Sequence, residues 1–291
     1  MAAPLSVIII SRNEGKFLQR TVENFEATLP ARSEIIVVDD DSTDGSAGFL
    51  AQRRPRVRLL RTPAIGVARA RNLGARRSSG EVLLFADAHL TMPAGWCEPL
   101  LEVLEDPAVG GVAPGIRGMT PLHQPGYGLR FRGPAMEVTW NARKPRHASP
   151  APILPGCALA MRRTVFECPG GSWDEGLLQR GNVDNEISVR LWLLGYRLMV
   201  VPEVMVRHRF RKNSPFPVGW PQYLHNRLRL AFVHFNDERL TLCIGALRAY
   251  PGFGEALRLV TESDVAARRR LILSLRAKDD DWYFSKFRLD W

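Results

Sequence analysis

Two metal-binding residue types stand two positions apart directly after an apolar run. Residues 82–85 are four consecutive apolar residues, which predicts a buried strand of a parallel sheet. Asp87 and His89 follow at its carboxyl end, where ligands bind in open α/β sheets. In an extended chain, side chains at positions i and i+2 point to the same side, so this carboxylate and imidazole can share one cation. The alternative interpretation is an Asp that caps the next turn and a His that is merely exposed.

The chain before this strand has the pattern of a nucleotide-binding sheet. Residues 5–10 and 34–38 are mainly apolar and predict buried strands, and the apolar residues between them have helical spacing up to Pro30. A strand–helix–strand unit of this kind is typical of nucleotide-binding α/β folds. No Gly-x-Gly-x-x-Gly occurs, which argues against a dinucleotide site of that type. A further strand is expected at residues 57–60 and a helix from Gly66.

Polar side chains near these strand ends suit a nucleotide. Asp40 ends the second strand, and a carboxylate there can accept hydrogen bonds from a base or ribose, so we predict that it reads the base. Asp41 and Asp44 are better interpreted as turn caps. Arg69 and Arg71 lie near the start of a helix, where they suit a diphosphate. The alternative for both arginines is a solvated basic face.

The second half of the chain carries further charged candidates. Residues 117–150 are expected to be an irregular connection, of the kind that forms binding loops or mobile segments. Asp184 and Glu186 begin a helix that Gly195 ends, and one of the two can be simply a cap. His208 follows another apolar run, residues 197–201, and lies in a basic setting.

The last part of the chain is expected to be helical. Residues 223–235 and 239–249 have apolar stripes, which predicts a helical extension after a main domain of residues 1–235. Within that domain we expect a nucleotide-binding half, 1–105, and a second half, 106–235. The acidic run 279–281 is interpreted as a solvated turn rather than a metal site.

Composition narrows the class of protein. The 291 residues carry a net charge of +10, which allows nucleic acid, an anionic membrane surface or a phosphorylated substrate as partner. The basic residues are scattered and no nucleic-acid-binding motif is recognisable, so no nucleic-acid role is expected. The four cysteines lack zinc-site spacing and suit reduced thiols of a cytoplasmic protein. No signal peptide or transmembrane segment is recognisable, so a soluble chain is expected, and peripheral membrane contact stays open.

These stretches together resemble the family-2-like nucleotide-sugar glycosyltransferases with the GT-A fold, a mainly parallel, Rossmann-like α/β sheet flanked by helices. The chain is most similar to the catalytic domain of polypeptide N-acetylgalactosaminyltransferases. The matching stretches occur in the family's order within about residues 5–235, and they are residues 7–14, 36–42, 66–71, 85–89, 96–101, 173–176, 186–192 and 208–212. The lectin module and membrane anchor of the animal enzymes are not recognisable, so a bare bacterial catalytic domain is expected.

The resemblance implies a role for each matching position. Asp87, His89 and His208 would bind Mn²⁺, or Mg²⁺, which bridges the diphosphate of a UDP-sugar; mixed imidazole and carboxylate ligands favour Mn²⁺. Asp40 would bind uracil, and Arg69 the sugar-phosphate. The loop expected to flank the uridine consists of Ser11, Arg12, Asn13 and Glu14. Arg211 and Lys212 would neutralise the leaving diphosphate, on a loop through Trp220 that closes as a lid.

The start of the helix at residue 183 departs from the family pattern. The N-acetylgalactosaminyl enzymes have Gly-Glu-Asn-Leu-Glu before Ile-Ser, whereas residues 182–186 read Asn-Val-Asp-Asn-Glu. Val183 therefore replaces an acid near the sugar. Asp-Asn-Glu resembles inverting family-2 enzymes, in which the equivalent of Asp184 is the general base toward the acceptor hydroxyl. Asp184, Glu186 and Arg211 are the predicted catalytic residues, and retention and inversion both stay open.

The predicted function is transfer of a sugar, such as GalNAc, GlcNAc or another hexose, from a UDP-sugar to a hydroxyl of a peptide, glycan or small-molecule acceptor. The basic surface and the aromatic C-terminal tail favour an anionic or membrane-proximal acceptor. The main alternative is a catalytically inactive nucleotide-sugar-binding partner module. A nucleotidyltransferase would need a Gly-rich phosphate loop after the first strand, which residues 11–15 do not resemble.

Overall fold

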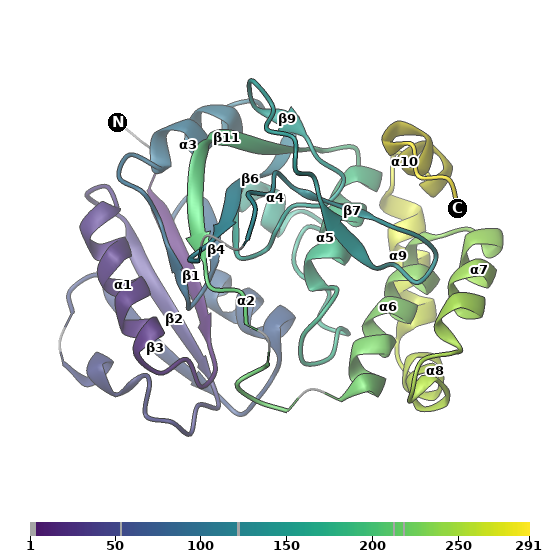
Figure 1. The fold of residues 1–291 in the computed structure, drawn as a ribbon, viewed down its shortest axis with the longest axis horizontal. Helices are drawn as coiled ribbons and strands as arrows, with labels where there is room; N and C mark the ends of the chain where they lie inside the picture. The colour runs from purple at the N-terminus through teal and green to yellow at the C-terminus, as the bar shows by residue number, and fades with distance from the viewer. Residues whose placement is uncertain (1–3, 53, 121–122, 212, 218) are drawn as a thin grey trace.

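A mixed, mainly parallel β-sheet forms the centre of the molecule (Figure 1). The computed structural model describes residues 4–52, 54–120, 123–211, 213–217 and 219–291. The strand order is β3-β2-β1-β4-β10-β6-β11-β5, and β9 also pairs with β11. The strands are β1 Leu5–Ser11, β2 Glu34–Asp40, β3 Val57–Thr62, β4 Val82–Asp87, β5 Leu90–Thr91, β6 Val109–Gly118, β7 Leu129–Phe131, β8 Val138–Trp140, β9 Ser149–Pro150, β10 Ala158–Arg162 and β11 Arg197–His208.

Helices cover both faces of this sheet. Along β1, Val7 and Ile9 face one apolar core and Ile8 faces the other, because successive strand residues point to opposite faces. Helices α1 and α3 contribute to the first core, and α2, α5 and α6 to the second. The helices are α1 Lys16–Thr28, the 3₁₀ turn η1 Gly48–Ala51, α2 Val67–Arg76, α3 Cys97–Leu104, α4 Arg163–Glu167, α5 Val183–Leu193, α6 Trp220–His234, α7 Asp237–Leu247, α8 Phe253–Thr261, α9 Val265–Leu275 and α10 Asp280–Phe287.

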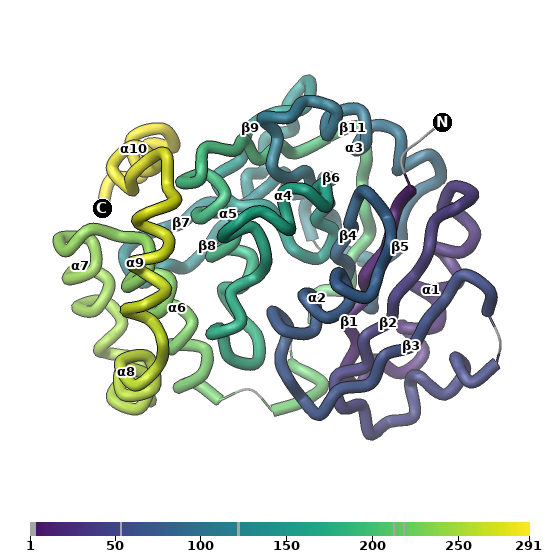
Figure 2. Tube along the Cα trace, turned by 180° about the vertical axis from the view of Figure 1, so that it is seen from behind, coloured from purple at the N-terminus to yellow at the C-terminus, as the bar shows by residue number. Residues whose placement is uncertain are grey.

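The helices α6 to α10 gather at one end of the molecule, away from β1 to β3 (Figures 1 and 2). They pack on the rest of the chain through α6, which contacts α5, α7, α8 and α9, and through α10, which contacts α5. The aromatic C-terminal tail is part of the core, since Tyr283 and Phe284 are buried and Trp291 packs against Phe131 and Phe235. The helical extension expected after residue 235 is confirmed, while the domain boundary itself stays a prediction.

Two expectations for the second half of the chain are wrong in part. The strand expected at residues 197–201 continues to His208 as one strand, with a shift of register against β6 between Val201 and Met205. Pro202 has no backbone N–H to donate to the sheet. It is tolerated there because the regular pairing with β6 is interrupted at this point. Residues 117–150 are not wholly irregular, since β7 and β8 pair as an antiparallel hairpin and β9 joins the main sheet.

The acidic run 279–281 is a helix start rather than a solvated turn. Asp279 caps α10 by accepting from the Trp282 N–H at 2.8 Å. Asp280 is buried and accepts from the Asn236 N–H at 2.8 Å and from Arg239 at 2.9 Å. The run therefore fastens α10 to α7. Among the described helices, none combines the length and the apolar character needed to span a bilayer.

Candidate active site

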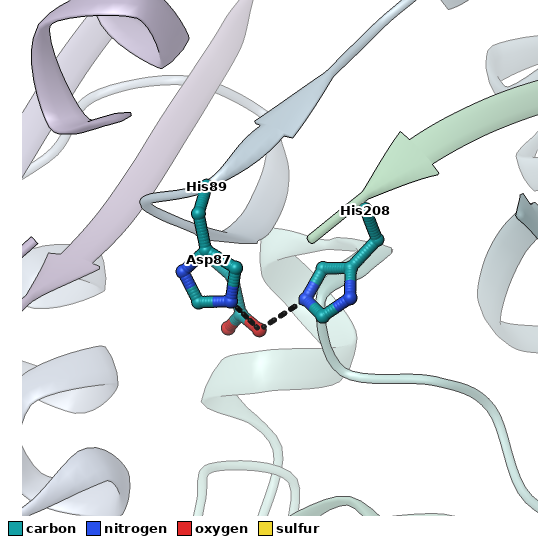
Figure 3. A group of neighbouring side chains, drawn as sticks. All are labelled: Asp87, His89 and His208. Atoms are coloured by element: carbon teal, nitrogen blue, oxygen red, sulfur yellow. Dashed lines mark hydrogen bonds and ion pairs between the residues drawn. The ribbon is translucent and has the colours of Figure 1, made fainter. Parts of the chain in front are cut away.

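Strand pairing brings Asp87, His89 and His208 together at the carboxyl edge of the sheet. Asp87 ends β4, His89 lies in the turn before β5, and His208 ends β11 opposite Leu90. Both histidine rings turn toward the Asp87 carboxylate (Figure 3). Nε2 of His208 lies 3.1 Å from Oδ2 of Asp87, and Nε2 of His89 lies 3.9 Å from the same oxygen. The fold therefore brings together the three residues predicted to bind a metal, although His208 lies 121 positions after Asp87 in the sequence.

The three side chains fit a divalent cation. One ligand atom from each lies within 4.8 Å of the other two, which is a spacing that one ion can bridge. A carboxylate oxygen with two imidazole nitrogens suits Mn²⁺ better than Mg²⁺, which prefers oxygen ligands. The surroundings keep the carboxylate ionised: burial alone raises the pKa of Asp87, but the His208 hydrogen bond and the charges of both histidines and Arg71 lower it well below its usual range.

Glu14 supports this cluster from the loop after β1. Its Oε2 lies 3.0 Å from Nδ1 of His89, and Arg211 pairs with both carboxylate oxygens. Burial raises the pKa of Glu14, but the hydrogen bonds from His89 and Arg211 outweigh it and the pKa is lowered. Glu14 is therefore an ionised carboxylate directly behind the imidazole of His89, a predicted metal ligand.

Arg71 links two carboxylates at the site. Its guanidinium is buried, donates to Asp184 at 2.8 Å and to the Gly156 carbonyl at 2.8 Å, and lies 3.8 Å from Asp87. The Trp173 ring lies beneath it, 4.2 Å from the guanidinium carbon. Because Gly156 leaves no space for a side chain, Asp184 packs directly against this backbone. Asp184 is thereby held in place and stays partly exposed, a placement that a general base requires.

A cavity of about 480 Å³ opens over these groups. Asp87, His89, His208, Asp184 and Arg211 all line it, which brings most of the predicted site into one place. The other lining residues are Ile10, Arg12, Glu14, Asp40, Gly66, Val67, Arg71, Gln179, Arg180, Gly181, Asn182, Val183, Arg209, Phe210, Asn213, Ser214, Pro215, Phe216 and Tyr223. Such a cavity, with both acids and arginines, suits a ligand that carries a diphosphate and a metal.

Some of the residues predicted to surround the nucleotide line the cavity, and others support the loop after β1. Arg12 lines the cavity, with its guanidinium 4.9 Å from the Phe216 ring centroid, whereas Ser11 is buried at the end of β1 and does not line the cavity. Asn13 braces the loop by accepting from the Thr43 N–H at 2.8 Å.

Asp40 also lines the cavity, but its two oxygens accept from Thr62 and from the backbone N–H groups of Ile65 and Gly66, at 2.7 to 2.9 Å. It therefore fixes the turn before α2, and its contact with a base stays a prediction.

Four described residues of the predicted site do not line the cavity, and besides Ser11 and Asn13 these are Arg69 and Glu186. Arg69 is exposed and donates to the Glu175 carbonyl at 2.9 Å, while Arg71 faces the site. Glu186 is fully buried, where it pairs with Arg190 and accepts from His234, so its surroundings favour a structural role and its predicted catalytic role stays a prediction. Both side chains lie away from the cavity for the same reason, because residues two apart on a helix point about 200° from each other. Lys212 lies outside the described residues.

Sequence reasoning missed the turn that precedes α5. The carbonyl of Gln179 accepts from the Val67 N–H at 2.8 Å, which fastens this turn to the start of α2. Gln179, Gly181 and Asn182 all have positive φ, and a Cβ at Gly181 would lie 2.3 Å from the Tyr223 ring. The Gly181-Asn182 pair, which favours such a conformation, was the available signal.

Comparison with known proteins identifies the family. The model of the family described as "Glycosyl transferase family 2" matches residues 6–169, which include β1 to β6 and the Asp87–His89 pair. The chain belongs to this family. Curated relatives include the polypeptide N-acetylgalactosaminyltransferase 11 of Xenopus tropicalis, 29% identical over 303 residues, and polypeptide N-acetylgalactosaminyltransferase 3 of Taeniopygia guttata, 31% identical over 311 residues. Both alignments cover 96% of this chain and 49% of the relative, so the chain spans about half the length of these proteins.

Solved structures of glycosyltransferases share the fold. GalNAc-T7 with UDP, GalNAc and Mn²⁺ superposes with a TM-score of 0.79 at 23% identity, over 99% of this chain and 58% of that one. The TarS protein of S. aureus in complex with UDP-GlcNAc gives a TM-score of 0.58 at 16% identity, over 96% of this chain and 89% of that one. The GT-A fold and the similarity to N-acetylgalactosaminyltransferase catalytic domains, both expected from the sequence, are confirmed for this family-2 member.

Proposed function

We propose that this family-2 protein is a metal-dependent glycosyltransferase that moves a sugar from a UDP-sugar to a hydroxyl of an acceptor. The single observation that carries the proposal is the cluster of Asp87, His89 and His208, which lines the same cavity as Asp184. The GalNAc-T7 structure of the same fold is described with UDP, GalNAc and Mn²⁺, which supports this donor class. The names of the curated relatives support an N-acetylhexosamine donor and a polypeptide acceptor.

The residues of the cavity provide a role for each part of the reaction. Asp87, His89 and His208 would hold Mn²⁺, which supplies charge stabilisation for the departing diphosphate. Arg211 and Arg12 line the same cavity and add positive charge for the phosphates. Asp184 accepts a hydrogen bond from Arg71 through Oδ1 and lines the cavity, where its other carboxylate oxygen would accept the proton of an acceptor hydroxyl.

The test is a panel of UDP-sugars incubated with the protein, with and without Mn²⁺. We expect Mn²⁺-dependent release of UDP from one donor, and the anomer formed, followed by NMR, decides between retention and inversion. Asp184→Asn should lose turnover and still bind UDP with Mn²⁺. If no donor is turned over while UDP is bound, the protein acts instead as a nucleotide-sugar-binding module.

The location expected from the sequence is also a proposal. The four cysteines, Cys97, Cys157, Cys168 and Cys243, are free thiols in the described structure, which supports a reducing, cytoplasmic setting. A bacterial source has no support from the curated relatives named above, which are animal proteins. Peripheral contact with a membrane can be tested by sedimentation with anionic vesicles.

A further inference from the structure

One carboxylate, that of Glu14, connects the metal cluster to the segment that follows β11. Glu14 is buried between Asn13 and Gly15, which both have positive φ, so the loop aims its side chain into the site. Its Oε2 lies 3.0 Å from Nδ1 of His89, and its Oε1 accepts from Arg211 at 2.9 Å. Glu14 thus contacts a metal-binding residue and a residue that lines the cavity at the same time.

The bond to His89 decides which ring nitrogen is available to a cation. When Nδ1 donates its proton to Glu14, Nε2 keeps its lone pair. That nitrogen faces Oδ2 of Asp87 at 3.9 Å, within the cluster. A carboxylate behind a metal-binding histidine fixes the tautomer and the ring orientation, and raises the basicity of the ligand.

The Glu14 carboxylate also pairs with Arg211, so one carboxylate contacts both His89 and a cationic side chain of the cavity. Arg211 lines the cavity and extends from the residues after β11, whose last residue, His208, is itself in the metal cluster. While Arg211 pairs with Glu14, it partly neutralises the charge behind His89. A diphosphate that draws Arg211 away restores that charge, so the anion and the cation favour each other's binding.

We propose that Glu14 is a positioning residue that orients His89 for the metal and couples metal binding to nucleotide binding through Arg211. The inference rests on the proposed function, because the metal and the diphosphate are those of the UDP-sugar reaction. It assigns Glu14 a role other than contact with the uridine.

The test measures Mn²⁺ binding to the intact protein in the absence of nucleotide, from the EPR signal of free Mn²⁺. Glu14→Gln keeps the size of the side chain and removes its charge, and we expect Mn²⁺ to bind about 10- to 100-fold more weakly. Glu34→Gln is the matched control, because Glu34 is a partly buried carboxylate that bonds Ser6 and Ser79 at the other end of β2. The control should bind Mn²⁺ within about twofold of wild type, as expected for a substitution remote from the metal.

The coupling has its own readout. UDP should strengthen Mn²⁺ binding by a larger factor in wild type than in Glu14→Gln, and Arg211→Gln should show the same reduced factor. In the double variant, the factor by which UDP strengthens Mn²⁺ binding should be no smaller than in the more impaired single variant. The reason is that both substitutions break the same connection. A double variant whose losses simply add would overturn the coupling.

Failure of this inference differs from failure of the proposed function. If wild type binds Mn²⁺ and Glu14→Gln binds it within twofold, the positioning role is wrong and the glycosyltransferase proposal stands. If wild type binds neither Mn²⁺ nor UDP, the proposed function itself is wrong. Should Glu14→Gln fail to fold, ¹H–¹⁵N spectra of wild type with Zn²⁺ decide: His89 protonated at Nδ1 and bound through Nε2 supports the role, and the opposite tautomer overturns it.

Discussion

Replacement of Glu186 by Gln tests whether this acid is structural rather than catalytic. Glu186, Arg190 and His234 are all fully buried. Arg190 donates to both Glu186 oxygens at 2.8 and 2.9 Å, and His234 lies 2.9 Å from Oε1. The amide of Gln cannot accept from all of these donors, and the Arg190 charge loses its partner in the core. Breaking a buried pair in this way costs about 3–5 kcal/mol of unfolding free energy.

That loss is large against the total stability of a typical domain, about 5–15 kcal/mol. At about 2–4 °C per kcal/mol, the midpoint of thermal unfolding should fall by about 6–20 °C. The assay is urea denaturation with thermal unfolding as a second measurement. Glu167→Gln is the control, because Arg163 and Glu167 form an exposed i,i+4 pair at 3.5 Å whose contribution is about 0–1 kcal/mol.

The pH dependence follows from the same contacts. Burial alone raises the pKa of Glu186, but the charge and hydrogen bonds of Arg190 and the bond to His234 lower it well below the ordinary value of 4.5. A group whose pKa is lower in the folded state contributes stability above its unfolded pKa and loses it as the pH falls below that value. The gap in stability between wild type and Glu186→Gln should therefore be full at pH 6 to 7 and shrink below about pH 4.5.

The kcat of Glu186→Gln, measured below its unfolding temperature, tests whether Glu186 is structural or catalytic. A structural Glu186 predicts that the folded variant keeps kcat within about threefold, since the side chain does not line the cavity. If Glu186→Gln retains the stability of wild type and loses kcat by 100-fold or so, our interpretation of the buried network is wrong.

Further substitutions test the geometry of the cavity. Gly156→Ala would place a Cβ 1.8 Å from Oδ1 of Asp184 and displace that side chain. Turnover should therefore fall by about 10- to 100-fold, while UDP binding with Mn²⁺ changes little. Unchanged turnover would contradict a role of Asp184 in the reaction. Arg71→Gln should lower kcat by at least about tenfold and Arg69→Gln by less than about twofold, and the reverse order in steady-state kinetics would contradict the placement of the two arginines. His208→Ala should weaken Mn²⁺ binding by at least about tenfold in calorimetry, and retention of wild-type affinity would exclude it as a ligand.

The sequence predicted the sheet well because its signals are local. Residues 82–85 and 35–38 are apolar runs with carboxylates just after them, and both lie in strands, as expected. Asp87 and His89 are close in sequence, so their placement at one strand end needed no knowledge of the rest of the fold. The pairing with His208 came from the resemblance to a family, since no local pattern relates positions 121 apart.

The sequence was least informative where the direction of a side chain depends on packing. Arg69 and Arg71 are both arginines, two positions apart near the start of α2. Only the way that α2 packs on the sheet decides which of them faces the site. Asp184 and Glu186 differ in the same way on α5, which is buried on nearly all sides. For a helix without a distinct polar face, the sequence contains little information about its rotation. Glu14 posed a related problem, because its partners, His89 and Arg211, are distant in sequence.

The antiparallel pairing of β5 with β11 limits how the gene for this protein can change in length. His208 pairs with Leu90 and Arg207 with Thr91, so the metal cluster depends on the register of these two strands. One codon inserted between Met205 and His208 would turn the imidazole to the opposite face of the sheet, although no residue of the site would be substituted. Upstream, the irregularity between Val201 and Met205 already accommodates a shift of register. Insertions and deletions should therefore be tolerated on one side of Met205 and eliminated by selection on the other, a pattern that a library of single-codon insertions along β11 would reveal.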